Sequence, residues 1–455
     1  MTRQATLTAV RAVGLPRSLA GCAVLLAAVA IAGGTGSSTA AAAVAAAPPS
    51  CVGKTAAGPF TTGTNAQGRP VVLAGDGKPF ISYGTSIPGL VGSPGRGQGY
   101  DNPKTWAGDY AKDRPKIIAT REEWCGNTVR LQVSQDNLLG PGGKSFYAAY
   151  MAAIGKEVSL AESYGLDVVL NDSTESAPAS VKNQQLGPNH ATERFWHYMV
   201  DKYGKDPHVI FDLFNEPRTY STGMSQATQW RLWWRGGTFQ GTKYLGMEAL
   251  AEYVRGHDSK TLFWVEGPNY SASFAGMTTR DRQLGHDAVI TVKNVVYAIH
   301  HPAGSHNPAG WKAAFGYLLS QHVAPVVEGE WTNFEPTPID ISCIPVGAHG
   351  ASAAPNAPPP PCPPPPTDSA CWNNAPWSVP GYLWYLAGNG IGMNAYQLAP
   401  DWLITNNNPE DPVPTIISIF WSCDPYFELQ PKEGAGAWLR YWFRRQNGEQ
   451  PPTPA

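Results

Sequence analysis

The sequence carries little charge for its length, and that charge is nearly balanced. Asp, Glu, Lys and Arg make up 15% of the 455 residues, against roughly a quarter in an average globular domain. The formal net charge is -2. Without an excess of positive charge there is no electrostatic reason to expect a nucleic-acid partner. Hydrophobic residues reach 42%, enough for a large core, which excludes disorder of the chain as a whole.

Long hydrophobic runs are absent beyond the first fifty residues. One run, Leu19–Gly33, follows three arginines and precedes small residues with Ala-x-Ala triplets up to Ala47. This pattern is typical of a secretory signal peptide over residues 1–47, which predicts a secreted, extracellular protein. An uncleaved membrane anchor is an alternative, although the run is shorter than the ~20 residues that a span needs. Lipidation at Cys22 is another, although the apolar stretch follows this cysteine.

Cysteine is scarce, and no Cys-x-x-Cys pair occurs. Because no histidine stands at finger spacing either, the sequence argues against a zinc site. Removal of the signal peptide leaves an even six cysteines in an exported chain, for which disulfides are the default expectation. The sequence does not choose among the possible pairings. Three of the six lie close together in the sequence, and we expect disulfides to hold that region together. The six are Cys51, Cys125, Cys343, Cys362, Cys371 and Cys423.

From about Val71, short β-rich apolar runs alternate with longer helical stretches, a pattern that predicts repeated βα units around a parallel sheet. Eight units favour an α/β fold of the (β/α)8 TIM barrel type, a single catalytic domain over residues 71–450 after an N-terminal extension over residues 48–70. An open doubly wound sheet is the alternative, weakly supported by glycines within 388–392. The expected strands are Phe80–Ser86, Thr128–Val133, Asp167–Asn171, Val209–Phe214, Leu262–Glu266, Val295–His300, Pro325–Glu330 and Tyr382–Leu386.

Helical stretches are expected between these strands. They cover Lys144–Tyr164, His190–Tyr203, Tyr244–Val254 and, near the end of the chain, Ala435–Arg445. The Pro/Ala-rich stretch 351–367 has the composition of a linker between domains. Because it falls between the expected seventh and eighth strands, we interpret it as a long rigid loop at the barrel mouth.

Two of the β-rich runs lead to a glutamate that is a candidate for chemistry. Val209–Phe214 leads into Asn215-Glu216-Pro217, and Pro325–Glu330 ends in a glutamate followed by Trp331. Since barrel active sites lie at the carboxyl ends of the strands, Glu216 and Glu330 are expected to converge. Paired carboxylates suit glycoside hydrolysis, in which one protonates the leaving oxygen while the other attacks the anomeric carbon or activates water.

Four other features bear on this assignment. Arg130, on the second expected strand, is the cation we place beside the nucleophile. Glu328 competes with Glu330, because residues two apart on a strand share a face. We prefer Glu330 because it lies nearer the end of the strand, and we expect Glu328 to lie deeper, beside an arginine.

His300 and His301 are neighbours on a strand and therefore face opposite ways, so no metal site is predicted. A Ser-His-Asp hydrolase is disfavoured because no Gly-x-Ser-x-Gly elbow follows a strand.

Tryptophan is abundant, with 16 residues. Flat aromatic rings stack on the apolar faces of sugars, but they also fill ordinary cores. Trp230, Trp233 and Trp234 follow the Asn-Glu-Pro strand, and both a stacking platform and helix packing stay open for them. Further candidates for stacking are Trp106, Trp331 and Trp377.

Asn-Glu-Pro after an apolar strand, followed later by Gly-Glu-Trp, resembles glycoside hydrolase family 5, the family of cellulases and mannanases. The likeness spans the mature domain, with further matches at Ser82–Thr85, Arg130, Tyr297–His300 and Trp384. The resemblance implies a retaining enzyme with two carboxyl groups about 5 to 5.5 Å apart. It assigns the acid/base to Glu216, a sugar 2-hydroxyl contact to Asn215, the nucleophile to Glu330, its orientation to Arg130, a site-lining role to His300 and the floor of the cleavage subsite to Trp384.

Two positions depart from the family pattern. Where the family usually has a histidine just past the third strand, the resemblance places Ser173. Pro302 stands where the family has a tyrosine that touches the nucleophile. Both differences concern the shape and hydrogen bonding of the cleavage subsite, and hence the substrate.

The sequence therefore predicts a secreted retaining glycoside hydrolase that cleaves β-linked glycans, most of all β-1,4-glucan of the cellulose type or β-mannan, by double displacement with two glutamates. No cofactor is expected. The expected partner is a polysaccharide or oligosaccharide substrate, with no nucleic acid, no membrane after signal cleavage, and a monomeric state. The alternatives are a catalytically impaired carbohydrate-binding barrel and a transglycosylase on the same fold.

Overall fold

The computed structural model describes most of the chain after residue 57. The described residues are 51, 58–91, 103–139, 147–174, 185–257, 260–301, 308–331, 382–383, 385–399, 403 and 436–446. All of them belong to the compact unit Pro48–Ala455. The predicted signal peptide and the proline-rich stretch 351–367 lie outside the described residues.

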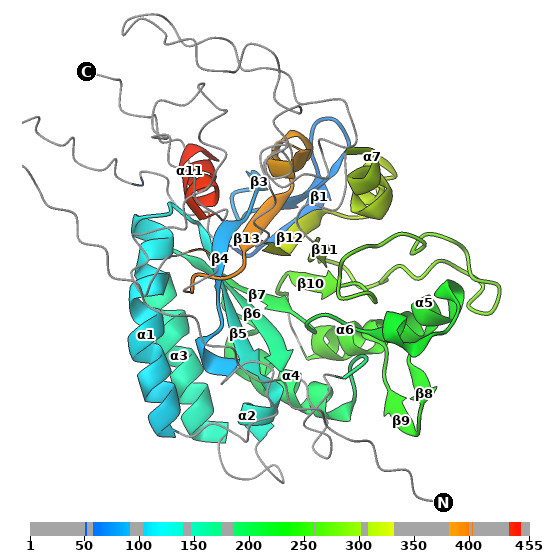
Figure 1. Cartoon of the computed structure of the whole chain (residues 1–455), viewed down its shortest axis with the longest axis horizontal. Helices are drawn as coiled ribbons and strands as arrows, with labels where there is room; N and C mark the ends of the chain where they lie inside the picture. Colours follow the sequence, from blue (N-terminus) through cyan, green and yellow to red (C-terminus); the bar gives the residue numbers. More distant parts are fainter. Residues whose placement is uncertain are drawn as a thin grey trace, which may run out of the picture. The chain divides into compact units, whose positions relative to one another are not determined.

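Eight parallel strands close into a barrel (Figure 1). Each strand pairs in parallel with both neighbours, in the order β4-β5-β6-β7-β10-β11-β12-β13 and back to β4. This confirms the predicted (β/α)8 barrel. The strands are β4 Tyr83–Ile87, β5 Thr128–Ser134, β6 Asp167–Thr174, β7 Val209–Asp212, β10 Phe263–Glu266, β11 Val295–Ile299, β12 Val326–Trp331 and β13 Gly392–Ala395.

The prediction of the eighth strand at Tyr382–Leu386 is wrong. Residues 382–383 and 385–389 are helical, and the eighth strand is β13. Tyr382 and Tyr385 stand three residues apart, on one side of a helix. Both rings pack against Trp311, with centroids 5.1 and 5.3 Å away. Tertiary packing therefore overrides the high strand propensity of this aromatic stretch.

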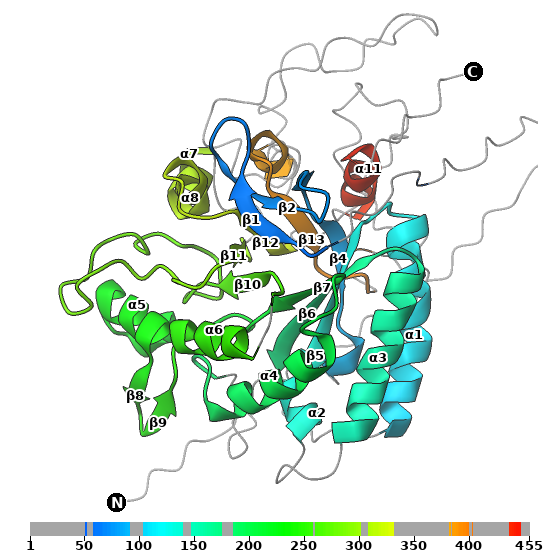
Figure 2. The ribbon, with the colours of Figure 1, turned by 180° about the vertical axis from the view of Figure 1, so that it is seen from behind.

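Helices cover the outside of the barrel, and α1 lies beside α3 along one side (Figures 1 and 2). The predicted helix His190–Tyr203 is present with those bounds as α4, where Asn189 forms a capping box with Thr192. The other helices are α1 Pro103–Glu122, α2 Gln135–Leu139, α3 Tyr147–Ser163, α5 Gln226–Arg235, α6 Met247–Gly256, α7 Pro308–Trp311, α8 Tyr317–Ser320 and α11 Gly436–Gln446, with short turns at Gly89–Val91, Thr219–Thr222 and Lys312–Gly316.

A small antiparallel sheet closes the amino-terminal end of the barrel (Figure 2). It consists of β1 Thr61–Thr64, β2 Pro70–Leu73 and β3 Pro79–Phe80. His322, just before β12, hydrogen-bonds the Gly68 carbonyl at 2.7 Å, and the Thr62 amide donates to Asn294, just before β11, at 3.2 Å. The sheet adds apolar side chains to the inward-facing barrel residues. This inner cluster contains Phe60, Ala74, Phe80, Val169, Ile210, Leu262, Trp264, Val296, Ala298 and Val327.

A disulfide joins Cys51 to Cys125, which follows α1. It is one of the pairings that the sequence left open, and the other four cysteines of the mature chain lie outside the described residues. Among the described helices, none has the length and apolar character needed to cross a lipid bilayer.

Candidate active site

Glu216 and Glu330 lie together at the carboxyl ends of the barrel strands. One carboxylate oxygen from each, together with a ring nitrogen of His300, forms a group whose atoms all lie within 4.8 Å of one another. The side chain of Glu216 is 29% exposed and that of Glu330 is 11% exposed. The sequence-based expectation that two strands deliver carboxylates to one place therefore agrees with the geometry.

The backbone turns sharply at Glu216. Strand β7 ends at Asp212, two residues earlier than predicted, so Glu216 does not continue the alternation of the strand. Its φ is 48°, in the left-handed region that non-glycine residues rarely occupy. The Glu216 amide donates a hydrogen bond of 2.6 Å to the carboxylate of Glu266. Such backbone strain is found mostly where a functional side chain must be aimed.

Arg130 is the fully buried cation at the centre of the cluster. Its guanidinium donates to Asp212 at 2.8 Å, to Asn215 at 2.9 Å, to Glu266 at 3.1 Å and also to Glu330. Burial alone would lower the pKa of Arg130, but the charges of Glu330, Asp212 and Glu266 raise it above its ordinary value. The predicted cation beside Glu330 is therefore present and stays charged.

Two further residues of the cluster were not predicted from the sequence. Gln132 donates from Nε2 to the same oxygen of Glu330 that Arg130 contacts, at 2.8 Å. Arg130 and Gln132 are two residues apart on β5, so they share a face. Asp212 is buried beneath Arg130, and burial, followed by the charge of Glu266, raises the pKa of Asp212 to about 7, although Arg130 opposes the rise.

Glu328 faces away from Glu330, against the prediction that the two share a face. The pairing register of β12 shifts between Glu328 and Trp331, an irregularity that breaks the alternation of the strand. One Glu328 oxygen accepts the His301 amide at 3.1 Å, and the other accepts the Tyr382 hydroxyl. The expected arginine partner is therefore wrong. Burial raises the pKa of Glu328 well above its usual range, and the Tyr382 bond opposes this.

His300 points into the site, and His301 points away from it. Nδ1 of His300 lies 3.0 Å from Glu216 Oε1, and Nε2 lies 3.2 Å from Glu266 Oε1. His301 instead packs its ring among aromatic rings outside the barrel wall, as the strand alternation predicted. Burial lowers the pKa of His300, but Glu266 and Glu330 raise it more, to well above the ordinary value.

A family model described as cellulase, glycosyl hydrolase family 5, matches residues 75–338, more than half of the chain. The chain belongs to glycosyl hydrolase family 5. The matched region contains Arg130, Glu216, His300 and Glu330.

A sequence relative and two solved structures are also similar to this chain. Endoglucanase Z of Dickeya dadantii (strain 3937) is 24% identical over 207 residues, which cover 44% of this chain and 39% of that protein. A thermostable, highly halotolerant GH5 cellulase from an Icelandic hot spring isolate is 15% identical, with 88% of this chain and 98% of that chain covered and a TM-score of 0.51. The alkaline cellulase K catalytic domain is 16% identical, with 86% and 96% covered and a TM-score of 0.51. The structural likeness shows that the fold is shared.

Most of the candidate stacking tryptophans of this family 5 barrel are packed inside it. Trp230 and Trp233 are buried, and their indole N–H groups donate to backbone carbonyls at 3.1 and 2.8 Å. Helix packing is therefore the correct alternative for both. Trp106 is buried as well, which contradicts its role as a platform. Trp331 is 2% exposed, and no bound sugar tests its predicted contact with substrate, which stays a prediction. Trp377 lies outside the described residues.

Tyr396 directly follows β13, the eighth strand of the barrel. It lies close enough to Glu216 and Glu330 for their charges to act on its hydroxyl group. Its amide donates to the Trp331 carbonyl at 3.0 Å. Burial, and then the charges of Glu330 and Glu216, raise the pKa of Tyr396. Sequence reasoning missed this residue because it placed the strand ten residues too early. The predicted floor residue, Trp384, lies outside the described residues.

The two departures from the family pattern can be placed only in part. Ser173 lies on β6 and is half-buried, and Pro302 lies outside the described residues.

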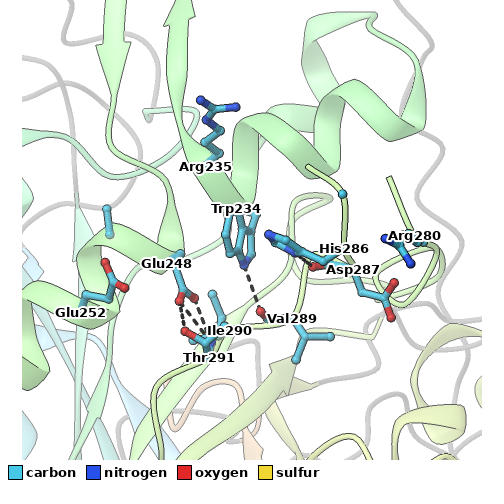
Figure 3. A pocket seen from close by; sticks show the side chains of 12 residues that line it. Trp234, Arg235, Glu248, Glu252, Arg280, His286, Asp287, Val289, Ile290 and Thr291 are labelled. Atoms are coloured by element: carbon cyan, nitrogen blue, oxygen red, sulfur yellow. Dashed lines mark hydrogen bonds between the residues drawn. The ribbon is translucent and has the colours of Figure 1, made fainter. Parts of the chain in front are cut away.

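A separate pocket of about 830 Å³ lies between α5, α6 and residues 280–291 (Figure 3). The Trp234 indole donates to the Val289 carbonyl at 3.0 Å, and Glu248 accepts the Thr291 amide at 3.0 Å. None of the residues that line this pocket belongs to the carboxylate cluster.

Proposed function

We propose that this protein is a retaining glycoside hydrolase that cleaves β-linked glycans. The observation that carries the proposal is the approach of Glu216 and Glu330 to within 4.8 Å at the mouth of a family 5 barrel. Retaining glycosidases hold their carboxyl groups about 5 to 5.5 Å apart, whereas inverting ones need roughly 6.5 to 9.5 Å to admit a water molecule. The short separation favours direct attack by a carboxylate.

Glu330 is the proposed nucleophile. One of its oxygens accepts hydrogen bonds from both Arg130 and Gln132. Hydrogen bonds from a cation and an amide fix the orientation of this carboxylate. The other oxygen is the one available for attack on the anomeric carbon, which would form a covalent glycosyl-enzyme as the leaving oxygen departs.

Glu216 is the proposed acid/base. It is the more exposed of the two carboxylates, and its oxygen lies 3.0 Å from His300. In the first step it would give its proton to the leaving glycosidic oxygen. In the second it would take a proton from the water that displaces the sugar from Glu330, which restores both carboxyl groups.

Asn215 is the proposed contact for the sugar 2-hydroxyl. Its side-chain oxygen accepts from Arg130 at 2.9 Å, which fixes the orientation of the amide. Hydrogen bonds to this hydroxyl strengthen in the transition state and therefore contribute to the rate.

The proposed substrate is a β-1,4-glucan, with β-mannan as the second candidate. Endoglucanase Z, the curated relative, and the two cellulases that share the fold support a glucan. We also propose that the chain is exported by its N-terminal segment, acts as a monomer, and needs no cofactor, since acid/base and nucleophile come from its own side chains.

The purified protein should release reducing sugar from one or more members of a panel of soluble β-glucans and β-mannans. Early products followed by NMR should carry the β-anomer, and Glu216→Gln should abolish release while the thermal unfolding midpoint stays unchanged. A folded protein that releases no sugar from any panel member, or that yields the α-anomer first, would overturn the proposal. Products longer than the substrate would indicate transglycosylation.

A further inference from the structure

A third strand of the barrel also ends in a glutamate at the site. Strand β10, Phe263–Glu266, pairs with β7 on one side and β11 on the other, the strands that lead to Glu216 and His300. The Glu266 side chain is fully buried. It has no part in the two-carboxylate chemistry, so its burial beside the reacting groups needs an explanation.

Both oxygens of Glu266 are engaged with the proposed machinery. Oε2 accepts the Glu216 amide at 2.6 Å. Oε1 lies 3.1 Å from Arg130 Nη2 and 3.2 Å from Nε2 of His300. Glu266 thus contacts the backbone amide of Glu216, the proposed acid/base. It also contacts the imidazole of His300, which in turn contacts the Glu216 side chain.

This arrangement is costly unless the contacts are specific. A buried carboxylate without partners would be strongly destabilising, and paired charges compensate only when their geometry is good. Hydrogen bonds from a backbone amide to an ionised carboxylate are short and strong. The amide that donates this bond to Glu266 belongs to Glu216, whose φ of 48° is a conformation that needs external support.

We infer that Glu266 is a positioning residue that holds Glu216, through its amide, and His300, through its imidazole, in the geometry for proton transfer to the leaving oxygen. The inference rests on the proposed function, because it assigns Glu216 as the acid. It adds a role for a carboxylate outside the catalytic pair.

If Glu266 has this role, the loss of rate in a Glu266 variant should depend on the leaving group of the substrate. A dinitrophenolate leaves without protonation, whereas a phenolate or a sugar alcohol needs a proton from the acid. Misplacing Glu216 should therefore slow phenyl glycosides and oligosaccharides more than dinitrophenyl glycosides. A defect in general folding would lower both rates by the same factor.

The test compares Glu266→Gln with the matched variant Glu248→Gln. Glu248 is also buried and also accepts a backbone amide, that of Thr291, but lies outside the site. For Glu266→Gln we expect kcat/KM to fall about 100-fold on the phenyl glycoside and at most about tenfold on the dinitrophenyl glycoside. Glu248→Gln should stay within about twofold of the unmutated protein on both.

Equal losses on both substrates, or no loss on either, would overturn the inference. If Glu266→Gln does not fold, Glu266→Asp retains the charge but withdraws it by one methylene, and it should give the same dependence on the leaving group.

A spectroscopic measurement keeps this test separate from that of the proposed function. With ¹⁵N-Glu labelling, the short bond to Glu266 should place the Glu216 amide proton far downfield, and Glu266→Gln should move it upfield. An unmutated chain that hydrolyses neither aryl glycoside defeats the proposed function, whereas a Glu216 amide that does not respond to Glu266→Gln defeats the positioning role.

Discussion

Glu328 and Glu330 stand two residues apart on β12 and face opposite sides of the barrel wall. Glu330 meets Arg130 and Gln132 inside, whereas Glu328 meets the His301 amide and the Tyr382 hydroxyl outside. The register shift in β12 produces this division. One glutamate is therefore available for chemistry, and the other ties the strand to a helix.

Replacing Glu328 should affect stability and not turnover. Glu328→Ala leaves two buried donors without an acceptor and a cavity in a packed region, so we expect the free energy of unfolding to fall by about 2 to 4 kcal/mol. Activity per folded molecule should change little. Urea unfolding and active-site titration measure the two quantities. A Glu328→Gln protein that is stable but inactive would contradict this division of roles.

Gln132 should contribute to holding the nucleophile. Gln132→Leu removes one of the two donors to Glu330, and we expect kcat/KM on an aryl β-glycoside to fall about tenfold, the value of one such hydrogen bond. Gln229→Leu is a suitable control, because Gln229 donates to the Met224 carbonyl away from the cluster. Equal kinetics for the two variants would refute the role of Gln132.

Asp212 should make stability depend on pH. The pKa of Asp212 is about 7 in the folded protein, above the value of about 4 in the unfolded chain. The contribution of Asp212 to the free energy of unfolding is therefore complete below pH 4 and is lost as the pH rises through 7. Relative to Asp212→Asn, the unmutated protein should lose about 3 kcal/mol of unfolding free energy across this window. Urea unfolding between pH 4 and 8 measures it. If the difference in unfolding free energy between the two proteins does not change with pH, Asp212 stays ionised throughout.

The disulfide between Cys51 and Cys125 should stabilise the barrel. It links residues separated by 74 positions, so it restricts the unfolded chain considerably. The double substitution Cys51→Ser and Cys125→Ser should lower the free energy of unfolding by about 2 to 5 kcal/mol. Thermal unfolding with and without a reductant offers the same comparison in the unmutated chain. Identical midpoints in both conditions would argue against a structural disulfide.

The position of the proposed catalytic pair was predictable because it depends on simple rules. A β-rich run that ends in a carboxylate carries it to the edge where parallel strands terminate, and two such runs led to Glu216 and Glu330. Arg130 was predictable as a cation within an apolar strand. The same signals could have revealed two missed residues, since Glu266 also ends a β-rich run and Gln132 shares the face of Arg130.

Other features depend on packing that the sequence does not encode locally. The strand Gly392–Ala395 contains no β-branched residue, so its propensity is low, whereas the aromatic stretch before it has high strand propensity and is helical. This reversal displaced the eighth strand and hid Tyr396. The orientation of Glu328 depended on a register shift between strands, which periodicity cannot predict.

The most direct test of the account is to identify the residue that becomes covalently bound during turnover. A 2-deoxy-2-fluoro β-glycoside with a good leaving group slows release of the glycosyl-enzyme, which allows peptide mass spectrometry to locate the sugar. The account predicts one added sugar on the peptide that contains Glu330, at Glu330 and not at Glu328, and no adduct in Glu330→Gln. Attachment to another residue, or turnover without any adduct, would contradict it.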